Sequence, residues 1–210
     1  MMVVALIDGP LPVVMPACRH RHLHCQPHPD ADRSPAARHA GQMAAAIMRN
    51  APGVAFDSHV VFPGHLNTFV VAVCEALERA ARSDARIVQC SFGIARNPPE
   101  LVRAVAAVRA AGKWLVASAP ARGAPVYPAG CDGVVAVQGD ARCGPAQWSR
   151  LDLPHARFGA CPTGPDPAIR GASIAAAHFT GLLAREHDAG RADLMPQTAP
   201  FQGRERIPAS

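Results

Sequence analysis

The sequence predicts an α/β fold with a mostly parallel central sheet and helices on both faces. Short apolar runs rich in β-branched residues alternate with Ala- and Leu-rich segments of helical periodicity through residues 1–140. This alternation is typical of parallel sheets, because the connection between two parallel strands usually carries a helix. A length of 210 residues with 49% hydrophobic side chains suits one domain with a sizeable core.

Each expected element ends at residues that terminate that kind of structure. The first strand, residues 2–7, is an apolar run that stops at Asp8 and Gly9. The first helix is expected to open at His39 and to continue to residue 50. Further strands are expected at residues 53–62, 86–91, 113–119 and 133–138. Further helices are expected at residues 67–83, with Asn67 as the N-cap, 98–111 and 171–187.

Two internal segments have no clear period. Residues 10–38 are rich in Pro, His and Arg and are predicted to form a long surface loop. Residues 139–170 are likewise predicted to be irregular. We expect one domain over residues 1–190, followed by a polar C-terminal tail over residues 191–210.

Composition argues against several classes of function. The net charge of +5 is mild and the arginines are scattered, so nucleic-acid binding is not expected. No apolar stretch reaches membrane-spanning length, and the N-terminus lacks the basic region of a signal peptide. The seven cysteines have no regular spacing and favour free thiols in a reducing compartment. We therefore expect a cytoplasmic protein that is not inserted into a membrane.

Three residues in the order Asp, His, Ser stand where a parallel α/β fold places functional groups. Asp8 follows the first strand, His39 opens a helix, and Ser173 begins the last long helix behind Gly171. Acyl transfer by a serine needs a base for its hydroxyl, an acid to orient that base, and donors for the oxyanion. A helix N-terminus supplies such donors through its free N–H groups. Taken singly, Asp8 could be a turn former, His39 a core histidine and Ser173 an N-cap.

Six segments in order resemble the subtilisin-like serine peptidases, over about residues 3 to 185. They include the aspartate, histidine and serine segments of that family and three segments between them. The six are VALIDGPLP, RHAGQMAAAI, IVQCSFG, GKWLVASAPARG, PVYPAGCDGVVAVQGD and GASIAAAHFTGLLA. The resemblance implies a three-layer fold and a catalytic triad of Asp8, His39 and Ser173. It also implies an extended peptide substrate, bound along Ser91, Phe92, Gly93 and along Ala117, Ser118, Ala119.

The sequence departs from the family at the oxyanion site. Ala121 stands where the family has an asparagine whose amide stabilises the oxyanion. The oxyanion region here is expected to consist of Ala121 and the backbone N–H of Ser173. Ser118 or Asn67 could provide a compensating side-chain donor.

These features predict a serine endopeptidase that processes a selected substrate, such as the leader peptide of one dedicated precursor. The alternative is a catalytically weak or inactive module of the same fold that binds peptides. The absence of the oxyanion asparagine at Ala121 favours this alternative. No cofactor is expected. The segment CRHRHLHCQPHPD contains metal-capable residues from Cys18 to His28, but its spacing does not match usual zinc sites. It is interpreted as a solvated basic loop, and no metal site is predicted.

Overall fold

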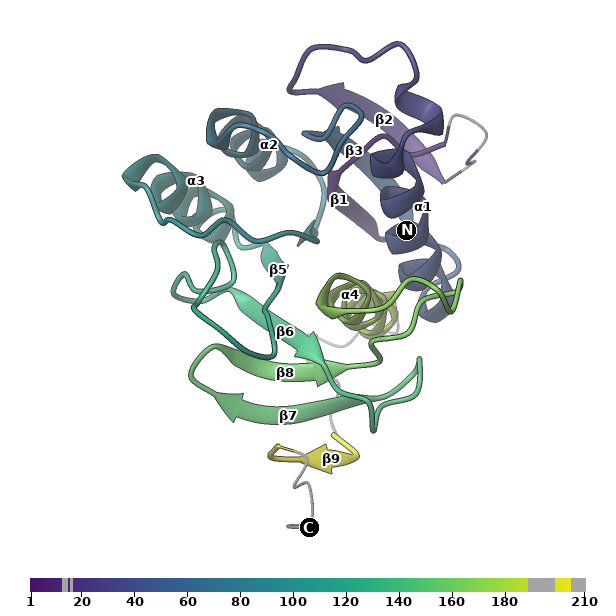
Figure 1. Cartoon of the computed structure of the whole chain (residues 1–210), viewed down its shortest axis with the longest axis vertical. Coiled ribbons are helices and arrows are strands. Elements are labelled where there is room, and N and C mark those ends of the chain that lie inside the picture. The colour runs from purple at the N-terminus through teal and green to yellow at the C-terminus, as the bar shows by residue number, and fades with distance from the viewer. Residues whose placement is uncertain (13–14, 16, 189–198, 205–210) are drawn as a thin grey trace.

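The computed structural model describes residues 1–12, 15, 17–188 and 199–204 of the chain. Within them, nine strands form one sheet in the order β2-β3-β1-β4-β5-β6-β8-β7-β9 (Figure 1). Adjacent strands from β2 to β8 are parallel, whereas β7 runs antiparallel to β8. The strands are β1 Val3–Asp8, β2 Cys18–Leu23, β3 Ala55–Val60, β4 Ile87–Cys90, β5 Trp114–Ser118, β6 Val135–Gly139, β7 Trp148–Leu153, β8 Ala156–Ala160 and β9 Phe201–Gln202.

Helices cover both faces of this sheet and give the predicted three layers. They are α1 Pro35–Asn50, α2 Val70–Arg82, α3 Pro99–Ala110 and α4 Ala172–Asp188, with a short 3₁₀ helix, η1, at Ala31–Arg33. Figure 1 shows α1 and α4 on one side of the sheet and α2 and α3 on the other. Strand β1 is buried on both faces: Val4 and Leu6 pack with α1 and α4, while Ala5 and Ile7 pack with α2 and α3. This burial explains why β1 is a continuous apolar run rather than an alternating one.

The prediction of a surface loop over residues 10–38 is wrong. The segment contains β2, an edge strand that pairs in parallel with β3, and the first helix begins at Pro35 rather than at His39. Ser34 is the N-cap, since its hydroxyl accepts a hydrogen bond from the Ala37 N–H at 3.1 Å. Strand β2 has no apolar face to reveal it, because its side chains are exposed or only partly buried.

Two other element predictions are also wrong. Residues 139–170 contain the antiparallel strands β7 and β8, which sequence analysis treated as irregular. Their aromatic side chains belong to the core, where the Phe158 and Phe179 rings stack at 5.1 Å. Asn67 is not the cap of α2, which starts three residues later with Phe69 in the N-cap position.

The predicted tail over residues 191–210 lies largely outside the described residues. Its described part, residues 199–204, includes β9, which pairs in parallel with β7. The Gly203 N–H also donates a 2.8 Å hydrogen bond to the Arg150 carbonyl. This short segment is therefore attached to the edge of the sheet.

Helices α1 and α4 approach each other closely at Gly181. A β-carbon at Gly181 would lie 2.4 Å from the Ile47 carbonyl oxygen and 3.0 Å from the Asn50 β-carbon. Backbone atoms of α1 thus occupy the space that any larger residue on α4 would need. The short distance between α1 and α4 therefore depends on the absence of a side chain at position 181.

We expect Gly181→Ala to lower the free energy of unfolding by about 1–3 kcal/mol, because the added methyl group overpacks the contact with α1. Urea unfolding would measure this. Gly41→Ala, on α1, is the matched control: its β-carbon would meet nothing closer than Pro12 Cγ at 3.8 Å. That control should keep or raise stability, since Ala is the better helix former by about 1 kcal/mol. Equal effects of the two changes would contradict the close approach.

A buried histidine lies where β2, β3 and α2 meet. His59 on β3 is fully buried, and its Nδ1 lies 3.1 Å from His24 Nε2. The His22 ring packs on it at 4.9 Å, and Arg79 Nε donates to His22 Nδ1 at 3.0 Å. His59 Nε2 has no hydrogen-bond partner among the described residues. Burial, followed by the charges of His22, His24 and Arg79, lowers the pKa of His59 to about 3.

This histidine should make the protein less stable in acid. The folded chain holds His59 neutral while the unfolded chain binds a proton below about pH 6.5, so stability is present above that pH and falls as the pH drops towards 3. Through this group alone, acidification from pH 6.5 to 5.5 should lower the free energy of unfolding by about 1 kcal/mol. Urea titrations at both pH values test this. A His59→Leu variant, which cannot bind the proton, should show a smaller loss, and an equal loss would contradict the assignment.

Candidate active site

Asp8 stands at the carboxyl end of β1, one of the central strands. Its side chain is fully buried, and Oδ1 accepts a 2.7 Å hydrogen bond from the Gly9 N–H. His39 Nδ1 lies 2.9 Å from Oδ1 and 3.0 Å from Oδ2 of the same carboxylate. Because a carboxylate only accepts hydrogen bonds, Nδ1 of His39 must carry the proton. Its Nε2 is then left free to act as a base.

The contact between Asp8 and His39 depends on a close approach of backbone segments. His39 lies in the second turn of α1, and a β-carbon at Gly9 would meet the Ala36 carbonyl oxygen at 2.3 Å. Glycine at this position therefore lets the first turn of α1 sit directly against the end of β1. Pro35 begins that turn, where its missing N–H costs no helical hydrogen bond.

The electrostatic environment of His39 combines two opposing effects. Burial disfavours the imidazolium, but the hydrogen bond and the negative charge of Asp8 outweigh it and raise the pKa of His39 above its ordinary value. The His39 side chain remains 18% exposed, while that of Asp8 is 0% exposed. The imidazole of His39 therefore reaches the surface, whereas the carboxylate of Asp8 does not.

Ser173 is the second residue of α4, on the same face of the sheet as α1. It follows Gly171, whose φ of 134° is a conformation that favours glycine. The Ser173 hydroxyl donates a 2.8 Å hydrogen bond to the carbonyl of Ser91, just after β4. In this rotamer it is bonded to Ser91 rather than to His39 Nε2. Ser173 thus lies against the segment predicted to bind substrate, at the end of α4 where backbone N–H groups lack helical partners.

The predicted substrate-binding residues fall into two groups. Ser91 is buried, whereas Phe92 is half-buried and Gly93 is exposed beyond the end of β4. The other group, Ala117, Ser118 and Ala119, lies at the end of β5, which is flanked by β4 and β6. The two groups are joined by a hydrogen bond from the Ser118 hydroxyl to the Phe92 carbonyl, at 3.3 Å.

Neither expected substitute for the oxyanion asparagine is brought to that position by an observed contact. Ala121 is exposed in the loop after β5, and its carbonyl accepts a 3.4 Å hydrogen bond from Arg204 Nη2. The Ser118 hydroxyl already donates to Phe92. Asn67 is exposed before α2, where it lines a separate pocket with His24 and Cys25.

The metal-capable segment is used for contacts within the protein. His20 Nδ1 lies 3.0 Å from Asp57 Oδ1, and Cys25 donates to the Val60 carbonyl at 3.5 Å. Burial raises the pKa of the Cys18 and Cys25 thiols. Over residues 1–12, 15, 17–188 and 199–204, no group of three or more His, Cys, Asp or Glu side chains is arranged to hold a metal ion.

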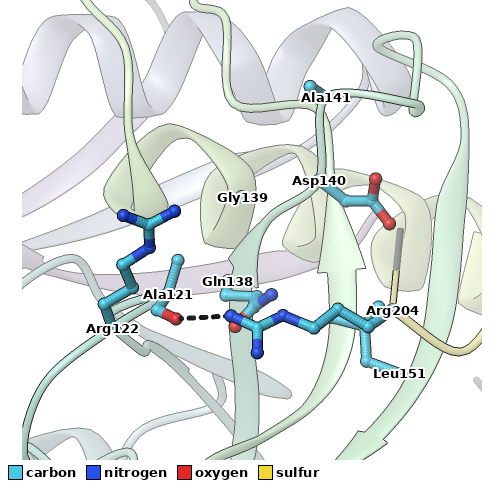
Figure 2. Close-up of a pocket in the computed structure, with 8 residues that line it drawn as sticks. All are labelled: Ala121, Arg122, Gln138, Gly139, Asp140, Ala141, Leu151 and Arg204. Atoms are coloured by element: carbon cyan, nitrogen blue, oxygen red, sulfur yellow. Dashed lines mark hydrogen bonds between the residues drawn. The ribbon is translucent and has the colours of Figure 1, made fainter. Parts of the chain in front are cut away.

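Sequence analysis missed a second pocket, at the carboxyl ends of β5 and β6. It has a volume of about 620 Å³ and presents the basic side chains of Arg122 and Arg204 (Figure 2). Arg122 follows Ala121 directly, so this basic residue could have been noted beside the oxyanion segment. Arg204 had no such signal, because it lies in the C-terminal segment and reaches Ala121 only through the fold.

No protein-family model and no curated protein matches this sequence. Several solved structures do match. A mutant of the protease domain of PatA has a TM-score of 0.67 at 21% identity, covering 90% of this chain and 81% of that one. The prenylagaramide maturation protease PagA has a TM-score of 0.62 at 19% identity, covering 90% and 78%. A cold-adapted subtilisin-like serine proteinase has a TM-score of 0.69 at 16% identity, covering 87% and 74%.

These similarities establish the subtilisin-like α/β fold that the sequence motifs predicted. Among the described residues, no helix combines the length and apolarity needed to cross a lipid bilayer.

The role of Asp8 can be tested by Asp8→Asn. The amide of asparagine can donate to His39 Nδ1, which would move the imidazole proton to Nε2 and remove the base. For the predicted triad, we expect the rate of covalent labelling of Ser173 by a fluorophosphonate to fall by about 10⁴, as kcat does for the analogous change in serine proteases.

Asp57→Asn is the matched control for this test. Asp57 is also a buried aspartate on a strand with neighbours on both sides, and it also contacts a histidine, His20, at 3.0 Å. This control should label at the unchanged rate. Equal losses in the two variants would show that Asp8 acts through stability alone.

Proposed function

We propose that this chain is a serine endopeptidase that cleaves a peptide bond by acyl transfer through Asp8, His39 and Ser173. The observation that carries this proposal is the hydrogen bond from His39 to the buried carboxylate of Asp8, on a subtilisin-like fold that has Ser173 at the start of α4. The solved structures with this fold include proteases, which supports the same reaction class here.

The proposed reaction begins with rotation of the Ser173 hydroxyl away from the Ser91 carbonyl. His39 Nε2 takes the proton of this hydroxyl as the oxygen attacks the scissile carbonyl carbon, and Asp8 stabilises the imidazolium that forms. His39 then gives the proton to the leaving amine, and water hydrolyses the acyl-enzyme by the reverse sequence. The raised pKa of His39 matches this role, because Asp8 favours the charged form of the base.

The oxyanion would be stabilised by the backbone N–H of Ser173, at the positive end of the α4 dipole. The methyl group of Ala121 provides no second donor. The loss of one such donor reduces turnover by about 10²–10³. We therefore expect slow turnover, which is compatible with one cleavage per substrate molecule and poorly suited to general digestion.

The substrate is proposed to lie extended across the carboxyl ends of the strands, along Ser91, Phe92 and Gly93. A β-carbon at Gly93 would lie 2.6 Å from Val126 Cγ2, so the segment is closely packed on its inner side and open on the outer one. Strand β5 is paired on both sides, with β4 and with β6. Ala117, Ser118 and Ala119 would therefore support the peptide-binding segment from below and contact the peptide only where β5 ends.

Two of the structural neighbours support the proposal of a processing role. PatA and PagA are described as maturation proteases. By analogy, this chain would remove the leader peptide from one dedicated precursor. A reducing, cytoplasmic location is proposed as well, because all seven cysteines are unpaired.

Labelling by a fluorophosphonate probe tests the proposal directly. We expect a covalent adduct on Ser173 in the unchanged protein, because only a serine activated by a base reacts at a useful rate. The adduct would be located by mass spectrometry of the digested protein. Ser173→Ala and His39→Ala should each abolish it.

The control is Ser83→Ala, which alters a serine that donates to the Ala80 carbonyl at the end of α2, far from the site. It should label like the unchanged protein. Absence of labelling in folded protein would contradict the peptidase proposal and would favour a module that only binds peptides.

A further inference from the structure

The pocket of Figure 2 lies on the same edge of the sheet as the proposed active site. Asp8 ends β1, Ser91 follows β4, and the pocket contains Gln138 and Gly139 from the end of β6. All these strands are parallel, so their carboxyl ends meet at one edge. Ala121, three residues beyond the end of β5, borders the pocket. A peptide that crosses this edge can therefore extend from Ser91 towards the pocket.

The pocket carries two positive charges that no carboxylate of the described residues neutralises. Figure 2 shows the Arg204 guanidinium extending towards Ala121 and Gln138, with Arg122 on the other side of Ala121. Within the described part of the chain, Arg204 donates to the Ala121 carbonyl at 3.4 Å, and both arginines are exposed. Neither forms an ion pair within the described part of the chain.

The single carboxylate of the pocket is already occupied. Asp140 binds Arg142 through two oxygens: Arg142 Nε lies 3.0 Å from Oδ1, and Arg142 Nη2 lies 2.7 Å from Oδ2. Although burial acts in the opposite direction, the hydrogen bonds from Arg142 hold the pKa of Asp140 below its ordinary value. The Asp140–Arg142 pair is therefore neutral in sum, and the charge of Arg122 and Arg204 remains.

The fold also positions Arg204. Arg142 Nη2 donates a 2.6 Å hydrogen bond to the carbonyl of Gly203, the residue before Arg204. The Gly203 N–H in turn donates to the Arg150 carbonyl on β7 at 2.8 Å. The residue that neutralises Asp140 thus also holds the backbone beside Arg204.

We propose that this pocket binds an acidic side chain of the peptide substrate, with Arg122 and Arg204 as its specificity-determining residues. The proposal rests on the proposed peptidase function, since it assigns the pocket to the substrate of that site. A guanidinium binds a carboxylate through paired N–H groups, and a volume of about 620 Å³ leaves ample space for an Asp or Glu side chain. The Gln138 amide, held by His155 at 3.2 Å, adds a polar wall.

Peptide binding to the Ser173→Ala protein tests this without any need for turnover. The probes are fluorescein-labelled decapeptides of Ala and Ser with amidated C-termini, which carry one Glu, or one Gln, at each position in turn. We expect the best Glu peptide to bind about tenfold tighter than its Gln counterpart, because its carboxylate can form ion pairs with two exposed guanidinium groups. The ratio should fall about threefold in Arg122→Gln, and should approach one in Arg122→Gln combined with Arg204→Gln.

The matched control is Arg103→Gln, which removes an exposed positive charge from α3, away from the pocket. It should leave the Glu-to-Gln ratio unchanged, whereas a general effect of net charge would reduce it equally. A ratio near one in Ser173→Ala, or a ratio that persists in the double variant, overturns the proposal. Because labelling of Ser173 is measured separately in the unchanged protein, failure of peptide selection is distinguishable from failure of the peptidase proposal.

Discussion

Helices α1 and α4 are distant in the sequence but pack on the same face of the sheet, and the proposed active site depends on how closely they can do so. His39 is carried by α1 and Ser173 by α4. Two glycines permit the geometry: Gly9 lets α1 meet the end of β1, and Gly181 lets α4 meet the backbone of α1. At both positions a side chain would collide with main-chain atoms, which cannot rotate out of the way as a side chain can. The positions of Asp8, His39 and Ser173 are thus set by backbone contacts rather than by flexible side chains.

The strands at the centre of the sheet were predictable because burial on both faces leaves a continuous apolar run, as in β1 and β5. The edges were not. Strand β2 is held by hydrogen bonds to β3 and carries polar side chains such as His20 and His22, so its pattern resembles that of a loop. Strands β7 and β8 lie towards the other edge, and their pairing is irregular between Arg150 and Leu153, where Asp152 has a φ of 52°. Edge strands depend on a neighbour, and a neighbour is not visible in a local pattern.

The same distinction applies to the candidate site. The pairing of Asp8 with His39 was predictable, since each belongs to a local segment with a recognisable pattern. The environment of Ala121 was not, because its carbonyl meets Arg204 from the opposite end of the chain. The net charge of the pocket beside Ala121 also depends on Arg142, which neutralises Asp140 and donates a hydrogen bond to the Gly203 carbonyl. Sequence reasoning could name the groups that are proposed to react, whereas the groups around them are assembled by long-range contacts.

A comparison within the molecule shows why residue chemistry alone does not define the site. Strands β1 and β3 each carry a buried aspartate that contacts a histidine Nδ1, at 2.9 Å for Asp8 and 3.0 Å for Asp57. In the parallel register Asp57 lies opposite Ala5, three residues before Asp8, and therefore within the strand rather than at its carboxyl end. The histidine that Asp57 contacts belongs to the edge strand β2, and its side chain is 56% exposed, against 18% for His39. Solvent screens the Asp57–His20 pair. The Asp8–His39 pair is partly desolvated and lies on the same edge of the sheet as Ser91 and α4. Position along the strand, and the helix packed beyond its end, separate a candidate catalytic pair from a structural one.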